Sequence, residues 1–125
     1  MLHHLSFAVA DLNRSARFYD AALAPLGYSR VWSDDTAVGY GTVAGQDKFA
    51  IRLRPDHQQA PGDGFHLAFS APDRASVLAF YEAALQHGGT DNGPPELCTE
   101  YGPGYYAAFV IDPDGYRIEA VIIGA

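Results

Sequence analysis

With 125 residues, 48% of them hydrophobic and 18% charged, the chain has the composition of one soluble globular domain. Its formal net charge of −7 provides no electrostatic attraction to nucleic acid or to an anionic membrane surface. The N-terminus lacks a basic segment and an apolar run of signal-peptide length, and the single cysteine, Cys98, excludes a disulfide framework, so a cytoplasmic protein is expected.

The first half of the chain has the hydrophobic periodicity of a strand, a helix and three more strands. Residues 3–10 alternate between apolar residues and small or polar ones, which predicts a strand with one buried face. Asp11 is a typical N-cap for the helix that follows, and a proline and a glycine near residue 27 are expected to end it. Three strands are then expected at residues 28–33, 37–43 and 49–54.

The second half repeats this order after the linker-like residues 55–64, which are rich in proline, glycine and polar residues. A strand is expected at residues 66–71, and Asp73 is expected to cap the second helix. The remaining elements expected are a weak strand at 96–100, a loop at 101–106, and strands at 107–111 and 116–123 joined by a turn at 112–115.

A sequence repeat decides the architecture. Residues 66–85 match residues 4–23 at a constant offset of 62 residues, with nine of twenty positions identical, and His66 matches His4. Neither half can bury its sheet alone. The sequence therefore predicts a single α+β domain over residues 1–125 that consists of two tandem βαβββ modules, at about 2–54 and 65–123. The sheets are expected to curl around a shared cavity with the helices outside and with both histidines pointing inward.

Three motifs carry a family resemblance: residues 4–23 (HLSFAVADLNRSARFYDAAL), 64–69 (GFHLAF) and 108–121 (AFVIDPDGYRIEAV). Together with the paired modules, they resemble the vicinal-oxygen-chelate superfamily, which includes glyoxalase I, extradiol dioxygenases and bleomycin-resistance proteins. The resemblance covers nearly the whole chain and implies the fold, but the superfamily hosts several reactions. It also implies a homodimer, in which the modules could pair within one chain or between two chains.

The resemblance implies a metal site. His4 and His66 match the two metal-binding histidines of the family, and Glu119 matches the carboxylate on the last strand. Two imidazoles and one carboxylate form a facial triad that suits a divalent iron, zinc, manganese or nickel ion and leaves positions open for a substrate. His3 is expected on the other face of its strand, without a role.

Four further residues are candidates for catalysis. Arg52 is assigned to the position of a second glutamate in glyoxalase I-type members; it cannot bind a metal, but it could clamp a substrate carboxylate or simply cover an exposed face. Tyr101, Tyr105 and Tyr106 belong to a glycine-rich loop that could form a lid with hydrogen-bonding hydroxyls, or could pack against a sheet edge. His57 and Cys98 are assigned no chemistry.

The leading interpretation is a metal-dependent enzyme, either a lyase or isomerase or an extradiol-type dioxygenase. Its partner would be a small molecule chelated through vicinal oxygens, anionic if Arg52 binds it, and neither nucleic acid nor membrane. The first alternative is a metal-free drug-binding protein of the bleomycin-resistance type, and the second is a structural or regulatory module with an empty cavity. Metal content would distinguish the leading interpretation from both alternatives.

Overall fold

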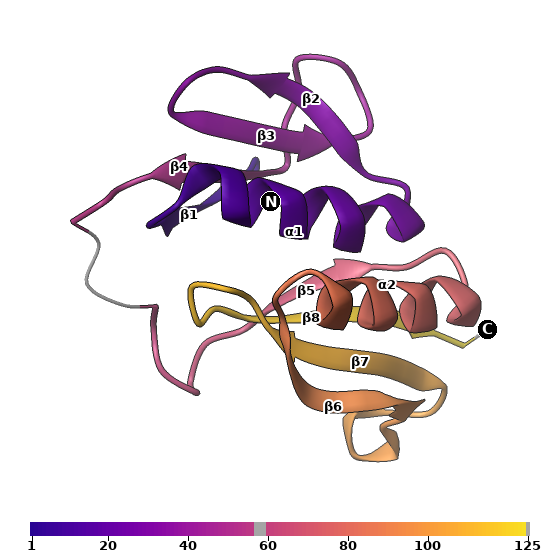
Figure 1. Cartoon of the computed structure of the whole chain (residues 1–125). Coiled ribbons are helices and arrows are strands. Elements are labelled where there is room, and N and C mark those ends of the chain that lie inside the picture. The colour runs from indigo at the N-terminus through magenta and orange to yellow at the C-terminus, as the bar shows by residue number, and fades with distance from the viewer. Residues whose placement is uncertain (57–59, 125) are drawn as a thin grey trace.

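The computed structural model describes residues 1–56 and 60–124 and confirms an α+β fold with two four-stranded mixed sheets and two long helices (Figure 1). The strand orders are β1-β4-β3-β2 and β5-β8-β7-β6. In each sheet the first strand of the module pairs in parallel with the last strand, and the other pairs are antiparallel. Part of the expected linker, residues 57–59 including His57, lies outside the described residues.

Each half of the chain has the predicted β-α-β-β-β order. Module one contains β1 (Leu5–Val9), α1 (Leu12–Leu23), the 3-10 helix η1 (Ala24–Leu26), β2 (Ser29–Ser33), β3 (Ala37–Gly41) and β4 (Phe49–Leu53). Module two contains β5 (Leu67–Ser70), α2 (Arg74–Gln86), β6 (Thr90–Leu97), the 3-10 helix η2 (Thr99–Tyr101), β7 (Tyr105–Ile111) and β8 (Arg117–Ile123). No helix in the described residues is long and apolar enough to span a bilayer.

Both helices begin at the predicted N-caps. The Asp11 carboxylate accepts a hydrogen bond from the backbone N–H of Arg14 at 3.0 Å, and Asp73 accepts one from the N–H of Ser76 at 2.7 Å. Each bond satisfies one of the amide groups that have no partner within the helix. After η1, Gly27 has a φ of 92°, a left-handed conformation that favours glycine.

The prediction for β6 was wrong, because this strand covers Thr90–Leu97 and not residues 96–100. Gly93 and two adjacent prolines make the segment resemble a loop in sequence. An edge strand tolerates such residues because only one of its sides needs hydrogen bonds, and the pairing with β7 is irregular around Gly93. The predicted loop at 101–106 is also shorter than expected, because β7 begins at Tyr105.

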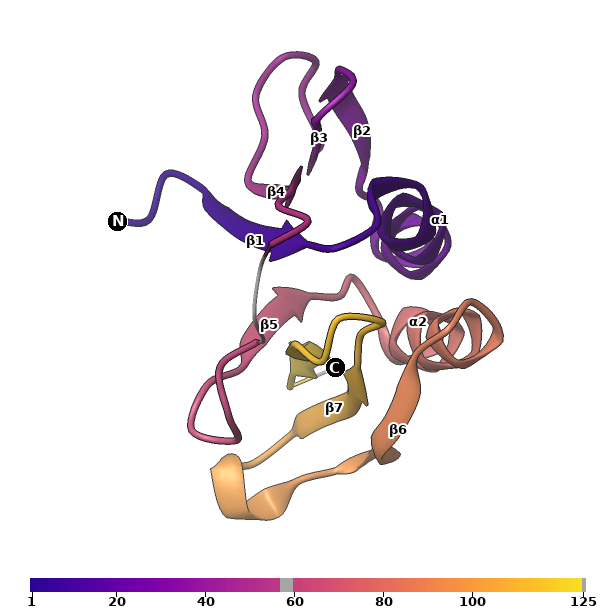
Figure 2. The same ribbon diagram turned by 60° about the vertical axis from the view of Figure 1, so that its left-hand side comes forward.

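One aromatic core joins the two modules. The helices α1 and α2 lie side by side, one on each sheet (Figure 2), and their apolar faces contribute to the core. Across the module boundary, Phe7 stacks on Tyr116 with 3.9 Å between ring centroids, and Phe49 meets Phe69 edge-on at 5.3 Å. The small residues of β1 and β5 therefore lie on the sheet faces that point away from the helices, and the sheets do not close into a barrel.

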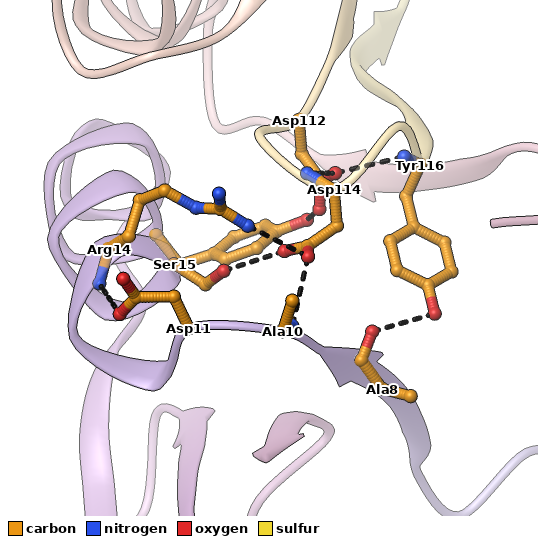
Figure 3. A network of polar contacts seen from close by, with 9 residues as sticks. Ala8, Ala10, Asp11, Arg14, Ser15, Asp112, Asp114 and Tyr116 are labelled. Carbon is orange, nitrogen blue, oxygen red and sulfur yellow. Dashed lines mark hydrogen bonds and ion pairs between the residues drawn. The ribbon is translucent and has the colours of Figure 1, made fainter. Parts of the chain in front are cut away.

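The turn between β7 and β8 is bonded to the start of α1 (Figure 3). The Asp114 carboxylate accepts hydrogen bonds from the N–H of Ala10 at 3.0 Å and the hydroxyl of Ser15 at 2.7 Å, and pairs with Arg14 at 2.9 Å. Ser15 is completely buried. This polar contact fixes one module against the other beside the aromatic core.

A second carboxylate of this turn, Asp112, is buried below the first. It accepts hydrogen bonds from the Tyr19 hydroxyl and from the backbone N–H groups of Asp114 and Tyr116. Burial raises the pKa of Asp112 to about 6, although these hydrogen bonds favour its charged form. The buried network thus contains a carboxyl group that titrates near neutral pH.

Two tyrosines cover the outer edges of the first strands. The Tyr116 hydroxyl of module two donates to the carbonyl of Ala8 in β1 at 2.8 Å, and the Tyr28 hydroxyl of module one donates to the carbonyl of Ser70 in β5 at 3.1 Å. Ala8 and Ser70 are equivalent positions of the 62-residue repeat. Each module therefore occupies a backbone acceptor on the free edge of the other, where a foreign strand would otherwise pair.

Candidate functional site

Two of the predicted metal ligands meet on the sheet of module two. Glu119 of β8 is paired with Ala68 of β5 in the parallel ladder, so both side chains lie on the same face. His66 lies two residues before Ala68 and shares this face. The His66 Nε2 atom is 2.9 Å from the Glu119 Oε1 atom.

The environment of Glu119 is unusual for a carboxylate. Its side chain is 0% exposed, and its Oε2 atom accepts a short hydrogen bond from the Tyr105 hydroxyl. The Oε1 atom has no hydrogen-bond partner, because the nearby Nε2 of His66 lies at contact distance without hydrogen-bond geometry. A buried carboxylate oxygen without a hydrogen bond is costly, so this atom is suited to a cation, either a bound metal ion or the imidazolium form of His66 at ion-pair distance.

A cavity of about 210 Å³ lies against this pair and is lined by His66, Tyr101, Tyr105, Phe109 and Glu119. Tyr105 and Tyr101 contact each other, with 5.3 Å between their ring centroids. Burial, together with the Glu119 carboxylate, raises the pKa of Tyr105 above its ordinary value, so its phenol stays protonated. The structure therefore brings two of the three candidate tyrosines to the candidate ligands.

The third predicted ligand, His4, lies elsewhere. Its Nδ1 atom is 2.8 Å from that of His3, and both rings line a cavity of about 270 Å³ between the start of β1 and strand β5. His4 does not line the cavity at Glu119. Within residues 1–56 and 60–124, no three histidine, cysteine or acidic side chains are close enough to hold one metal ion.

Tyr106 and Arg52 also lie away from this cavity. Tyr106 packs on the helix side of its sheet, where the Arg74 guanidinium lies 4.7 Å from the ring centroid. Arg52 lies on module one, with its guanidinium 5.7 Å from the centroid of the Trp32 ring. The alternation of β7 explains the first result, because Tyr105 and Tyr106 must point to opposite faces.

The strand register corrects the position assigned to Arg52. Ala50 of β4 pairs with Ser6 of β1 in the same way that Glu119 of β8 pairs with Ala68 of β5, and Ser6 and Ala68 are equivalent in the repeat. The position equivalent to Glu119 is therefore Ala50, two residues before Arg52. Alanine has no metal-binding atom, so module one still contributes no carboxylate here.

Sequence reasoning missed two residues that line the cavities beside the candidate ligands. Phe109 is paired with Glu119 across β7 and β8, and its ring lies 6.4 Å from that of His66. Arg117 precedes Glu119 by two residues and lines an adjoining cavity of about 330 Å³ together with His66 and Phe109. Strand alternation around Glu119 was a signal that could have identified Arg117, whereas Phe109 is brought there by the pairing of β7 with β8.

Comparison with known proteins identifies the family of this chain. A sequence model of the Glyoxalase/Bleomycin resistance protein/Dioxygenase superfamily matches residues 1–120. The chain belongs to this superfamily. It is 27% identical over 128 residues to the uncharacterized protein YqjT of Bacillus subtilis, which covers 96% of this chain and 97% of that protein.

Solved structures agree with the superfamily fold. A glyoxalase/bleomycin resistance protein from Albidiferax ferrireducens is 31% identical to this chain, with a TM-score of 0.78 and coverage of 94% of both chains. A glyoxalase I variant from Zea mays has a TM-score of 0.72 at 20% identity, and the match covers 94% of this chain but 45% of the maize chain. The second likeness concerns the fold alone.

Proposed function

We propose that this superfamily member is a metal-dependent enzyme that acts on a small substrate chelated through two adjacent oxygens, as a lyase, isomerase or extradiol-type dioxygenase. The observation that carries the proposal is the buried Oε1 atom of Glu119, which lacks a hydrogen bond and lies 2.9 Å from Nε2 of His66. With metal–ligand distances near 2.1 Å, two ligands at right angles are separated by about 3.0 Å. The spacing of the two atoms therefore suits two ligands of one ion.

The third ligand would be His4 of a second copy of the chain, which makes the active form a homodimer. His4 and Arg52 belong to the sheet of module one, whereas His66 and Glu119 belong to that of module two, and in one chain the two helices lie side by side on one side of both sheets (Figure 2). A dimer that pairs module one of one chain with module two of the other would bring these faces together. Two equivalent sites would result.

The remaining residues have roles that follow from their contacts. Tyr105 would orient the Glu119 carboxylate through its hydrogen bond, as residues behind a metal ligand commonly do. The exposed Tyr101 would close over the substrate from the cavity rim. When bound, a divalent ion supplies Lewis-acid stabilisation of the negative charge that develops on the substrate oxygens.

Metal content tests the proposal. Protein purified without chelator should contain about one divalent ion per chain by elemental analysis, and His66→Ala and Glu119→Gln should each lose it. His87→Ala is the matched control, because His87 is exposed and its ring nitrogen contacts the carbonyl of Ala83 at the end of α2. Full metal content in His66→Ala would remove His66 from the ligand set, and a metal-free wild type would favour the drug-binding alternative. Oxygen uptake would then separate a dioxygenase from an isomerase or lyase.

Mixed dimers test the shared site. If His4 acts across the interface, a dimer of one His4→Ala chain and one His66→Ala chain has one site with both substitutions and one intact site. Such dimers should bind about half of the wild-type amount of metal, whereas each pure variant should bind almost none. Metal retained in pure His4→Ala dimers would remove His4 from the ligand set.

A further inference from the structure

We propose that Arg117 binds a carboxylate group of the substrate, in the cavity beside His66. This inference rests on the proposed function and deepens it, because it assigns the substrate a negatively charged group at a defined place. It concerns residues within one chain and does not require the arrangement of the dimer.

Arg117 lies on the same face as the candidate metal ligands. It is the first residue of β8, two positions before Glu119, and it is paired with Ile111 of β7. The adjoining cavity of about 330 Å³ is lined by Arg117 and His66. This cavity and the one at Glu119 share His66, Tyr101 and Phe109 in their linings, so the two cavities are adjacent.

The Arg117 guanidinium has no partner in the described part of the chain. No carboxylate oxygen there lies within 4.0 Å of it, whereas Arg14 and Arg30 form ion pairs at 2.9 and 2.8 Å. Its Nε atom is buried and has no hydrogen-bond acceptor. A buried N–H without an acceptor is unfavourable, so this group is available to bind an acceptor from outside the chain.

The shape of the guanidinium identifies the acceptor. Its planar fork donates two parallel hydrogen bonds, which match the two oxygens of a carboxylate. Three exposed acids also line this cavity, Asp63, Glu96 and Glu100. Their repulsion would disfavour a dianionic group such as phosphate, so a carboxylate with a single charge fits better.

Phe109 supplies an apolar wall between the two cavities. Its ring lies against Gly93 of β6, where a Cβ atom would come within 3.0 Å of the ring. This close approach needs glycine, and the φ of 145° at Gly93 favours glycine as well. The predicted substrate is therefore a small acid with two adjacent oxygens at one end, a short apolar segment over Phe109, and a carboxylate at the other end.

Malate and lactate form a matched pair of probes. Both have a hydroxyl next to a carboxylate, and only malate has a second carboxylate. Calorimetric titration of the zinc-loaded protein should show malate binding at least about tenfold more tightly than lactate. Arg117→Gln should lower the malate affinity to that of lactate, leave the lactate affinity and zinc content unchanged, and leave the melting temperature within a few degrees of wild type. Arg117→Lys should retain part of the preference.

The control and a metal-free experiment keep the two proposals separate. Arg54→Gln should change neither affinity, because Arg54 is exposed, donates to the carbonyl of Leu53 and lines neither of the two cavities. In chelator-treated protein, succinate should shift the NMR signal of one arginine Nε–H, and Arg117→Gln should abolish that signal, so this result stands even if the protein binds no metal. Equal affinities for malate and lactate, a preference retained in Arg117→Gln, or no shifted Nε–H signal would overturn the assignment.

Discussion

Replacement of Asp114 by alanine should destabilise the whole chain, because this carboxylate joins the modules. The substitution removes the acceptor of the Ser15 hydroxyl, the Ala10 amide and the Arg14 guanidinium at once. Ser15 is fully buried, so its hydroxyl cannot find water as a substitute without a local rearrangement. The affected groups lie next to the contact between α1 and module two.

The size of the effect follows from the burial of each group. An unsatisfied buried hydroxyl costs about 1–3 kcal/mol, and the partly exposed amide of Ala10 costs about 1 kcal/mol. The Arg14 ion pair adds less than about 1 kcal/mol, because its side chain is 41% exposed and water screens the charge. The total is about 3 kcal/mol, a large fraction of the 5–15 kcal/mol that stabilises a typical domain, and corresponds to a melting temperature about 10 °C lower.

Urea denaturation followed by circular dichroism would measure this loss. Asp114→Asn is the matched variant, since its amide oxygen can still accept from Ala10 and Arg14 while its NH₂ group donates to Ser15. It should retain most of the stability. Asp35→Ala, an exposed aspartate elsewhere, should change the unfolding free energy by less than about 0.5 kcal/mol. The reasoning fails if Asp114→Ala lies within 1 kcal/mol of wild type, or if the asparagine variant is equally destabilised.

Three further predictions concern other parts of the fold. The pKa of Asp112 is about 6 in the folded chain and 3.8 in the unfolded chain, so the folded chain holds this proton more tightly. The contribution of Asp112 to stability therefore falls as the pH rises from about 4 to about 6. Unfolding free energies measured at each pH should show Asp112→Asn gaining stability relative to wild type across that range. Gly39→Ala would place a Cβ atom 2.2 Å from Nε1 of Trp32, so the only tryptophan must move and its fluorescence maximum should shift. Asp11→Ala should lower the unfolding free energy by about 1 kcal/mol in urea titrations, through loss of the N-cap.

The repeat was sufficient to predict the two modules, since matching strand and helix periodicities require matching elements. The repeat did not predict β6 correctly. This edge strand forms because it pairs with β7, and its own residues show no clear strand pattern. Gly93 and the prolines beside it are compatible with pairing on one side only. The residues of β6 alone therefore do not reveal that the strand depends on its partner.

For the candidate site, sequence alternation predicted the faces of the side chains but not which faces meet. It placed His66 on the inward face of its strand, the family resemblance supplied Glu119, and the structure brings these two side chains together. It did not indicate that, within one chain, His4 lines a different cavity from this pair. Arg52 was misassigned because only the pairing of β1 with β4 identifies Ala50 as the equivalent of Glu119.

The two tyrosine contacts at the strand edges also have a bearing on how the duplicated halves became one protein. The acceptors, Ala8 and Ser70, occupy equivalent positions, but the donors, Tyr116 and Tyr28, do not occupy equivalent positions of the repeat. Both copies of the repeat therefore have a strand carbonyl that needs a donor, and in each case a tyrosine at a different position of the opposite half provides it. A single half expressed alone would lose the donor that covers its first strand, so the halves have become interdependent parts of one folding unit.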